Sequence, residues 1–253
     1  MHVLEISRHV VKSLQGESLR TAELEPDGLA ADRRFGIRDE VTGKILTGRR
    51  EPSLLLAAAT LSSDGEPRIQ LPDGRLLTGL GSTMNGTLSS WIRRDVALVD
   101  SSTSPPSEAE ALEDPLDEDS TMMSWTMPAG RFVDLFPLLL VTTAALRAGA
   151  ALHPAGNWHQ RRFRPNMLID APGDDWAEDA WCGRRLRVGD AELTPVMPAV
   201  RCTMVTRPQD GLERDLDIFR TLSRHHGSTL GVWATVATPG ALHVGDAVEV
   251  TAD

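Results

Sequence analysis

The chain is a succession of short apolar segments, each closed by a pair of turn-forming residues. Such pairs occur at Thr42-Gly43, Asp64-Gly65 and Asp73-Gly74, and the sequence Val-Gly-Asp recurs at 188–190 and 244–246. Short runs with frequent Gly, Asp and Pro are typical of β-strands and tight turns, whereas alternating β and α units need longer periodic stretches. We therefore expect a mainly β protein with some helices (α+β), in which a β-rich N-terminal module precedes a closed β-barrel.

Two segments depart from this pattern and predict helices. A short helix is expected from Leu88 to Arg93, followed by a strand that ends near Asp100. In FPLLLVTTAALRAG a strand turns into a helix at Thr142-Thr143, where a threonine hydroxyl can cap the exposed amides of the first helical turn.

The composition changes abruptly at residues 101–120, SSTSPPSEAEALEDPLDEDS, which hold seven acidic residues and three prolines. Few of these side chains can enter a core, so we expect a solvated loop or linker; a docking patch for a partner protein is the alternative. This divides the chain into a β-rich module at residues 1–100, an acidic linker at 101–120 and a barrel domain at 121–253.

Charge and hydropathy exclude several kinds of partner. The formal net charge is -10, and the aromatic residues are only six Trp and five Phe, which disfavours nucleic acid and anionic membrane surfaces. The longest apolar run, 133–151, is interrupted by Asp134, Pro137 and Arg147, so it is a poor transmembrane candidate. The first residues lack the pattern of a secretory signal. We expect a monomeric cytoplasmic protein that binds neither nucleic acid nor membrane.

The chain has two cysteines, Cys182 and Cys202. A domain of this size needs no disulfide, so we expect both thiols to be reduced, although the sequence alone allows a bridge between them. Cys202 follows Arg201 at the point where the apolar run of TPVMPAVRCTMVTRP gives way to a turn. A buried cysteine often acts only as a small apolar side chain, and this interpretation stands beside that of a functional thiol.

Common catalytic motifs are missing from the sequence. It contains no phosphate-binding GxxxxGK[ST] loop, no GxSxG elbow, no HExxH zinc helix and no cysteine cluster for an iron–sulfur centre. The segment GLGSTMNG at 79–86 lacks the spacing of a dinucleotide site. The pair His225-His226 has no matching metal-ligand set and is expected at the surface end of a helix.

Basic residues stand in separate segments of this acidic chain. They include Lys12, Arg33, Arg49 with Arg50, Arg164 and Arg201, and Lys12 is one of only two lysines. Taken singly, each of these residues is explained as an ordinary exposed side chain. Lys12 would then lie on an edge strand, with its ammonium group reaching into water. Together they predict a pocket in which arginine forks, with Ser and Asn donors, bind one compact anion.

The order of these segments resembles the MOSC family, the molybdenum-cofactor-binding proteins whose domain also ends the cofactor sulfurases. The segments that carry the resemblance are VVKSLQGESL, GLAADRRFGIRD, ILTGRREPSL, RFRPN, WAEDAWCGRRLRVGDAEL, AVRCTMVT and GALHVGDAVEV. The resemblance covers nearly the whole chain. Within the family, the chain is similar to the mitochondrial amidoxime-reducing component and its bacterial counterparts. The resemblance implies a MOSC-type β-barrel with the N-terminal module that accompanies many members.

The resemblance also implies a set of site residues. Cys202 takes the place of the cysteine that ligates molybdenum, and a thiolate is a suitable soft ligand. Asp134 matches an acid near the metal, with a solvated loop carboxylate as the alternative. The candidate residues for binding the molybdenum-molybdopterin cofactor (Moco) are Lys12, Ser13, Arg33, Arg49, Thr142, Arg164, Asn166 and Arg201.

By the same resemblance, the expected activity is reduction of N-hydroxylated compounds, such as amidoximes, hydroxylamines and N-hydroxylated bases, to amines or imines. The ferredoxin domain fused to some relatives is not matched, so we expect a separate electron donor of the ferredoxin or b-type cytochrome kind. The alternatives are a sulfur carrier that holds a persulfide on Cys202, and a binding module without cofactor. Val200 and the short VTRPQDG segment depart from the family pattern beside Cys202, which leaves the substrate open.

Overall fold

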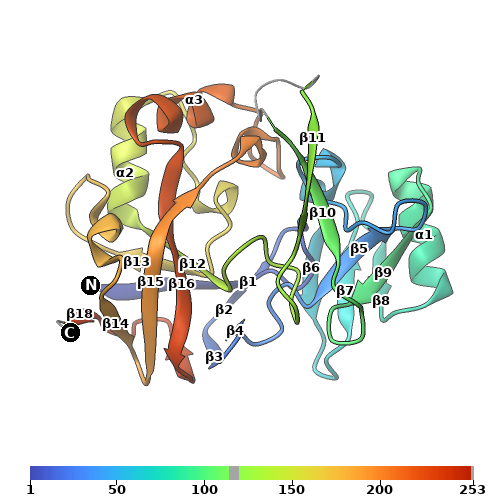
Figure 1. Ribbon diagram of the computed structural model, residues 1–253, viewed down its shortest axis with the longest axis horizontal. Coiled ribbons are helices and arrows are strands. Elements are labelled where there is room, and N and C mark those ends of the chain that lie inside the picture. The colour runs from blue at the N-terminus through green and yellow to red at the C-terminus, as the bar shows by residue number, and fades with distance from the viewer. Residues whose placement is uncertain (114–119, 252–253) are drawn as a thin grey trace.

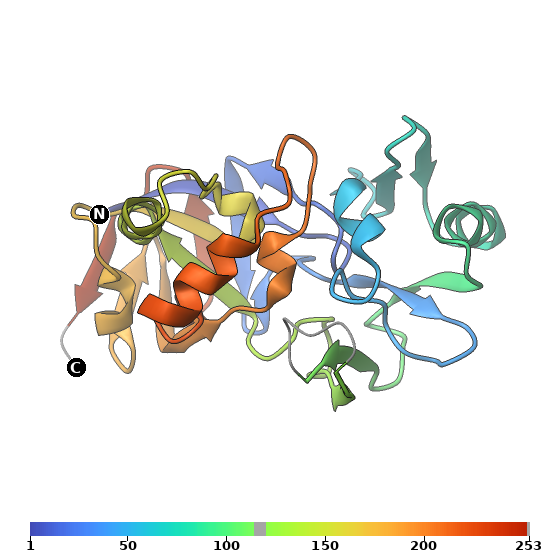
Figure 2. The ribbon, with the colours of Figure 1, turned by 90° about the horizontal axis from the view of Figure 1, so that it is seen from above.

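The computed structural model describes residues 1–113 and 120–251, and in this part of the chain strands predominate over helices, which confirms the mainly β expectation. Two lobes lie side by side, with α1 in one lobe and α2 and α3 in the other (Figures 1 and 2). The helices are α1 (Ser82–Ile92), α2 (Thr143–Leu152) and α3 (Leu216–His225), with single 3₁₀ turns η1 (Pro52–Leu56), η2 (Gln160–Arg162), η3 (Ala177–Trp181) and η4 (Thr203–Thr206).

The larger lobe, called here the barrel lobe, is built on an eight-stranded sheet. Its strand order is β18 (Val248–Thr251), β14 (Arg185–Val188), β15 (Ala191–Val200), β16 (Thr229–Thr238), β12 (Leu138–Thr142), β13 (Met167–Asp170), β1 (His2–Arg8) and β2 (Glu17–Leu19). A three-stranded sheet of β17 (Gly240–His243), β3 (Thr21–Glu25) and β4 (Gly28–Leu29) completes it. Among the strands of the described residues, only β12 and β13 pair in parallel, and α2 with η2 supplies the crossover that a parallel pair requires.

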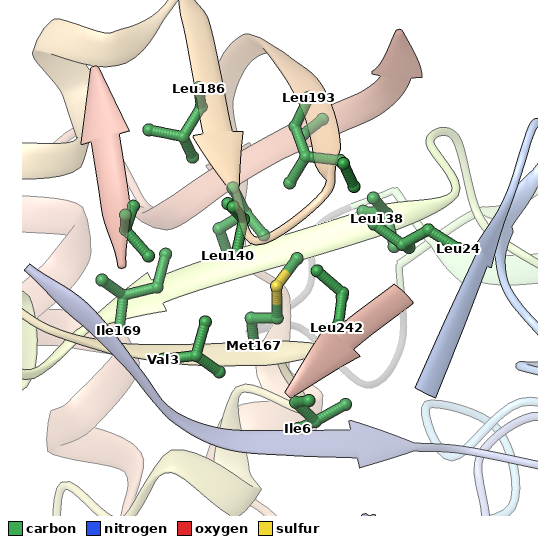
Figure 3. Close-up of a cluster of buried hydrophobic side chains, with 14 of the residues drawn as sticks. Val3, Ile6, Leu24, Leu138, Leu140, Met167, Ile169, Leu186, Leu193 and Leu242 are labelled. Atoms are coloured by element: carbon green, nitrogen blue, oxygen red, sulfur yellow. The ribbon is translucent and has the colours of Figure 1, made fainter. Parts of the chain in front are cut away.

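The start of β1 meets β18, at the opposite side of the long sheet, and this contact closes the barrel. The amide of Val3 donates to the carbonyl of Asp246, and that of Val248 to Met1, each over 2.9 Å. Apolar side chains from opposite walls fill the interior, as Figure 3 shows for Val3, Met167 and Leu186. Close packing of these side chains excludes water, so the barrel is a rigid support.

Strand β12 is buried on both faces, which explains its unbroken apolar sequence. Leu138 and Leu140 point into the barrel, whereas Leu139 and Val141 contact the cluster of apolar side chains that includes Ile218 of α3. The alternation follows from the two-residue period of a strand. The helices thus cover the outer face of the sheet.

The smaller, N-terminal lobe contains the remaining strands. They are β5 (Phe35–Asp39) with β9 (Val96–Asp100), β6 (Ala58–Leu61) with β7 (Pro67–Gln70) and β8 (Leu76–Thr78), and the hairpin β10 (Glu108–Leu112) with β11 (Met122–Thr126). Buried residues of α1, Met84, Leu88 and Ile92, pack against these strands. Asp64-Gly65 and Asp73-Gly74 form the turns between β6, β7 and β8, as expected.

The segment between β1 and β2 joins the two lobes. Residues 9–15 leave the barrel, and Val10, Val11 and Leu14 enter the core of the N-terminal lobe before β2 returns to pair with β1. The structure therefore differs from the expected boundary at residue 100, because strands near the N-terminus belong to the barrel sheet. Pairing between segments so far apart leaves no local sequence signal.

Three other expectations are corrected. Residues 108–112 of the expected linker form β10, because they pair with β11; residues 114–119 lie outside the described part of the chain. The segments on either side of the turn expected at Thr42-Gly43 do not pair as two regular strands, because β5 pairs mainly with β9 and meets Ile45 in one isolated bridge. Helix α1 begins six residues before Leu88. Within the described residues, no helix has the length and apolar character to cross a membrane.

Candidate functional site

A cavity of about 270 Å³ lies where the two lobes meet. The N-terminal lobe and the segment that joins the lobes contribute Lys12, Ser13, Arg33, Thr47 and Arg49. The barrel lobe and the segment before β12 contribute Val133, Asp134, Leu135, Phe136, Leu139, Phe163, Arg164, Asn166, Val200, Arg201, Cys202, Met204 and Trp233. Nine of the ten candidate residues from the sequence therefore line one cavity.

Asp134 is the electrostatic centre of this cavity. Its Oδ1 accepts a hydrogen bond from Lys12 Nζ and its Oδ2 one from Arg49, each over 2.6 Å. Although burial opposes ionisation, the charges of Arg49 and Lys12 hold the pKa of the Asp134 carboxyl well below its usual range. Asp134 lies in the loop before β12 with 38% of its side chain exposed, but two cations hold it as an ionised carboxylate that faces the cavity.

Lys12 is not on an edge strand, as its apolar neighbours had suggested, but in the turn that joins the lobes. Its amide donates to the carbonyl of Phe35, which fixes the turn against β5. The ammonium is buried and donates to the carbonyl of Phe132 over 2.8 Å as well as to Asp134. Burial lowers the pKa of this ammonium, and Asp134 opposes the shift.

Cys202 lies at the end of β15, where η4 begins. Its Sγ accepts a hydrogen bond from Arg49 Nε over 3.1 Å, and its side chain is partly accessible. Both Cys202 and Cys182 are free thiols, as expected, and Cys182 packs against the barrel core instead. The two cysteines therefore have different surroundings, and only Cys202 contacts the cavity.

Arg164 and Arg201 bring further positive charge to the cavity, and their hydrogen bonds go to backbone carbonyls. Arg164 donates to the carbonyl of Leu14 over 2.6 Å and Arg201 to that of Phe163 over 2.7 Å. Arg164 Nη2 and Arg201 Nε are buried and have no hydrogen-bond partner. Burial, with repulsion from neighbouring guanidinium groups, lowers the pKa of Arg164 to about 9 and that of Arg201 to about 10. Both remain cations at neutral pH.

Three lining residues hold a left-handed backbone conformation that residues with a side chain rarely adopt. Ser13 has a φ of 70°, Arg33 of 50° and Arg164 of 58°. Such a conformation costs about 1 kcal/mol or more for each residue and persists where the surrounding structure imposes it. Its recurrence at the wall of one cavity is typical of a binding site.

Asn166 and Ser13 are held by backbone groups. The side-chain oxygen of Asn166 accepts from the amide of Leu139 over 3.1 Å, which ties β13 to β12. Ser13 Oγ accepts from the amide of Gly48 over 2.9 Å, and its hydroxyl proton is free to turn towards a ligand. Arg33 is paired with the buried Asp32 and donates to the carbonyl of Arg164 over 3.3 Å.

Thr142 is the one candidate that the structure places elsewhere. It caps α2, accepting a hydrogen bond from the amide of Ala145 over 3.0 Å, and its hydroxyl donates to the buried Glu178 over 2.6 Å. The prediction of a strand-to-helix turn here is confirmed, but Thr142 does not line the cavity. The pair His225-His226 lies at the end of α3, as expected, and His225 is exposed, but His226 is partly buried, because it stacks on Trp176 and contacts Asp179 over 2.9 Å.

The other wall of the cavity is apolar, and Val200 is its one side chain that the sequence analysis had singled out. Its side chains are Leu135, Phe136, Leu139, Val200, Met204 and Trp233. Phe136 and Trp233 form an aromatic pair whose ring centroids lie 5.8 Å apart. Trp125 of β11 was also not predicted from the sequence. The Arg49 guanidinium lies over its ring, 5.1 Å from the ring centroid.

The site thus combines a thiol with a set of buried cations, and it lies between a barrel and a smaller β lobe. Two family models match a chain with this arrangement. The MOSC domain model matches residues 129–249, and the MOSC N-terminal beta barrel domain model matches residues 1–114. The chain therefore belongs to the MOSC family, whose domains occur in Moco-binding proteins.

Among solved structures, the YUAD protein from Bacillus subtilis has the same fold, with a TM-score of 0.50 and 12% identity over 98% of this chain and 94% of that one. YiiM from Geobacillus stearothermophilus matches over 46% of this chain and 54% of its own, with 13% identity and a TM-score of 0.36. No curated protein matches the chain.

Proposed function

We propose that this protein binds a phosphate-bearing molybdenum-pterin cofactor in the cavity between its lobes and reduces N-hydroxylated compounds. The observation that carries the proposal is the charge of the cavity wall. Lys12, Arg33, Arg49, Arg164 and Arg201 are five cations that line the cavity beside a single lining carboxylate, Asp134, and the buried Asp32 pairs with Arg33. Buried cations in excess require an anion, and unpartnered guanidinium groups supply donors for a phosphate.

The donor set fits such a cofactor. Cys202 offers a soft sulfur for molybdenum, and Arg49 fixes the position of that sulfur. Lys12, Arg33 and Arg164, with the Ser13 hydroxyl, would hold the phosphate. The described residues contain no group of three or more His, Cys, Asp or Glu side chains that could bind a metal without such a cofactor.

When bound, the cofactor supplies two electrons and a metal that accepts oxygen, so that R–NHOH, two electrons and two protons give R–NH₂ and water. The protein must deliver the protons. Asp134 is unsuited to donate one near neutral pH, because its pKa lies well below the usual range. Its role here is to hold Lys12 and Arg49 in place, while a water molecule hands over the proton. Electrons come from a separate donor protein.

The test is reduction of benzamidoxime to benzamidine by the molybdenum-loaded protein with a chemical electron donor. We expect turnover by the wild type, none by Cys202→Ser, and full turnover by Cys182→Ser, the matched control at the other free thiol. Turnover by a folded Cys202→Ser variant would overturn the proposal. A persulfide on Cys202 in protein that binds no molybdenum would instead indicate the sulfur carrier.

A further inference from the structure

The cavity has two chemically different walls, and the phosphate and metal of the proposed cofactor account for only one. The cations and Asp134 form one wall, where a phosphate and a metal can be held. The second, called here the apolar rim, consists of Leu135, Phe136, Leu139, Val200, Met204 and Trp233. It offers no charged group, so a ligand that contacts it must be recognised through apolar surface.

Two residues of the apolar rim are unusually accessible. Val200 is 53% exposed and Leu135 is 51% exposed, although both line the same cavity. Isolated exposed apolar side chains are common, but a group of them on the wall of a concave site indicates a binding surface. The strand β15 provides a comparison, because Val196 is 39% exposed and lies outside the cavity.

The aromatic pair in the apolar rim favours a ligand that carries an aromatic ring. Phe136 and Trp233 are half-buried, with ring centroids 5.8 Å apart and planes inclined by 35°. Trp233 lies on β16 opposite Leu139 of β12, so the sheet holds one face of the pair rigidly. An aromatic ring added beside such a pair gains both buried apolar area and favourable ring contacts.

The charged wall limits the ligand further. A cationic substrate would be repelled by Arg49, Arg201 and Lys12, which lie in the same cavity. An anionic substrate would compete for the cations that hold the proposed phosphate. A neutral molecule avoids both costs.

We infer that the apolar rim selects neutral N-hydroxylated substrates that carry an aromatic or branched apolar group, and disfavours small hydrophilic ones. This inference rests on the proposed function. The hydroxylated nitrogen faces the thiol wall, while the apolar group lies against Phe136, Trp233 and Val200. These three residues set specificity and take no part in the proton or electron transfer.

The test compares benzamidoxime with acetamidoxime, which share the same neutral head group and differ in a phenyl or methyl substituent. Binding to the molybdenum-loaded protein is measured by calorimetry without reductant, so that neither compound is consumed. We expect the dissociation constant of benzamidoxime to be at least about tenfold lower. Val200→Ser should raise it about threefold, and Val196→Ser should leave it unchanged.

Turnover of both amidoximes, measured in parallel with a chemical electron donor, separates this inference from the proposed function. Equal affinity for the two compounds, or an equal effect of Val200→Ser on both, would overturn the inference even if both are reduced. Preferential binding of benzamidoxime without reduction of either compound by fully loaded protein would overturn the proposed function and leave the rim as an apolar ligand site.

Discussion

Arg49 donates to the sulfur of Cys202 over 3.1 Å and, through a second nitrogen of the same guanidinium, to Asp134 over 2.6 Å. The two contacts connect the thiol of the barrel lobe to a residue of the N-terminal lobe. Because the guanidinium is planar and rigid, it fixes the sulfur and the carboxylate relative to each other. The lobes therefore build the site jointly.

Arg49→Lys should loosen the metal although it keeps the charge. An ammonium is a compact donor and cannot reproduce the two separate contacts of the guanidinium. Changing a residue that orients a metal ligand typically weakens metal binding about tenfold or more. We expect a correspondingly lower molybdenum content after dialysis. Arg50→Lys, at the neighbouring arginine that does not line the cavity, is the control; equal retention in both variants would contradict this role.

Asp134→Asn should destabilise the protein because it leaves Lys12 and Arg49 without their carboxylate. We expect a loss of roughly 1–2 kcal/mol in the free energy of unfolding near neutral pH, less than for a fully buried pair, since the Asp134 side chain is 38% exposed. The folded-state pKa is depressed, so this stabilisation is present above about pH 4 and lost on further acidification. Urea unfolding across this range measures it, and equal stability near pH 7 would be the contrary result.

Replacing Arg164 should have opposite effects on the stability of the metal-free protein and on retention of the cofactor. Its buried guanidinium has an unpartnered Nη2, and burial lowers its pKa to about 9. Arg164→Met removes this charge, so the metal-free protein should be as stable as the wild type or up to roughly 2 kcal/mol more stable. Molybdenum retention should fall, because the proposed phosphate loses its partner. A variant that is strongly destabilised yet retains its molybdenum would refute this assignment.

Glu178, which does not line the cavity, should make the free energy of unfolding depend on pH. Burial raises the pKa of its carboxyl from 4.5 to about 6, partly opposed by the hydrogen bond from Thr142. The folded protein then holds this proton more tightly than the unfolded chain. The resulting stabilisation is complete below pH 4.5 and disappears as pH rises through 6, a change of about 2 kcal/mol.

Glu178→Gln cannot titrate and serves as the comparison for that prediction. The difference in unfolding free energy between wild type and variant should decline from about pH 4 to about pH 7 and then stay constant. Urea titrations at several pH values measure it. A difference that is independent of pH would contradict the raised pKa.

Local chemistry made part of this structure predictable from the sequence. Asp64-Gly65 and Asp73-Gly74 favour tight turns by themselves, and Thr142 has the side chain that caps a helix. The contact of Lys12 with Asp134 joins residues 122 positions apart, and only the recurring family segments suggested that they meet. Lys12 itself was misplaced because the apolar neighbours Val10 and Val11 suit a strand but enter the other core. Apart from Val200, the residues of the apolar rim were not predicted, since they come from three stretches of the chain that are far apart in sequence.

The central claim is that Cys202 holds a molybdenum cofactor, and the most direct test is the molybdenum content per chain. It is measured by elemental mass spectrometry on wild type, Cys202→Ala and Cys182→Ala, each produced in a host that makes the pterin cofactor. We predict nearly one molybdenum per chain in the wild type and in Cys182→Ala, and its loss from a folded Cys202→Ala. Equal molybdenum in all three proteins, or none in the wild type, would contradict the claim.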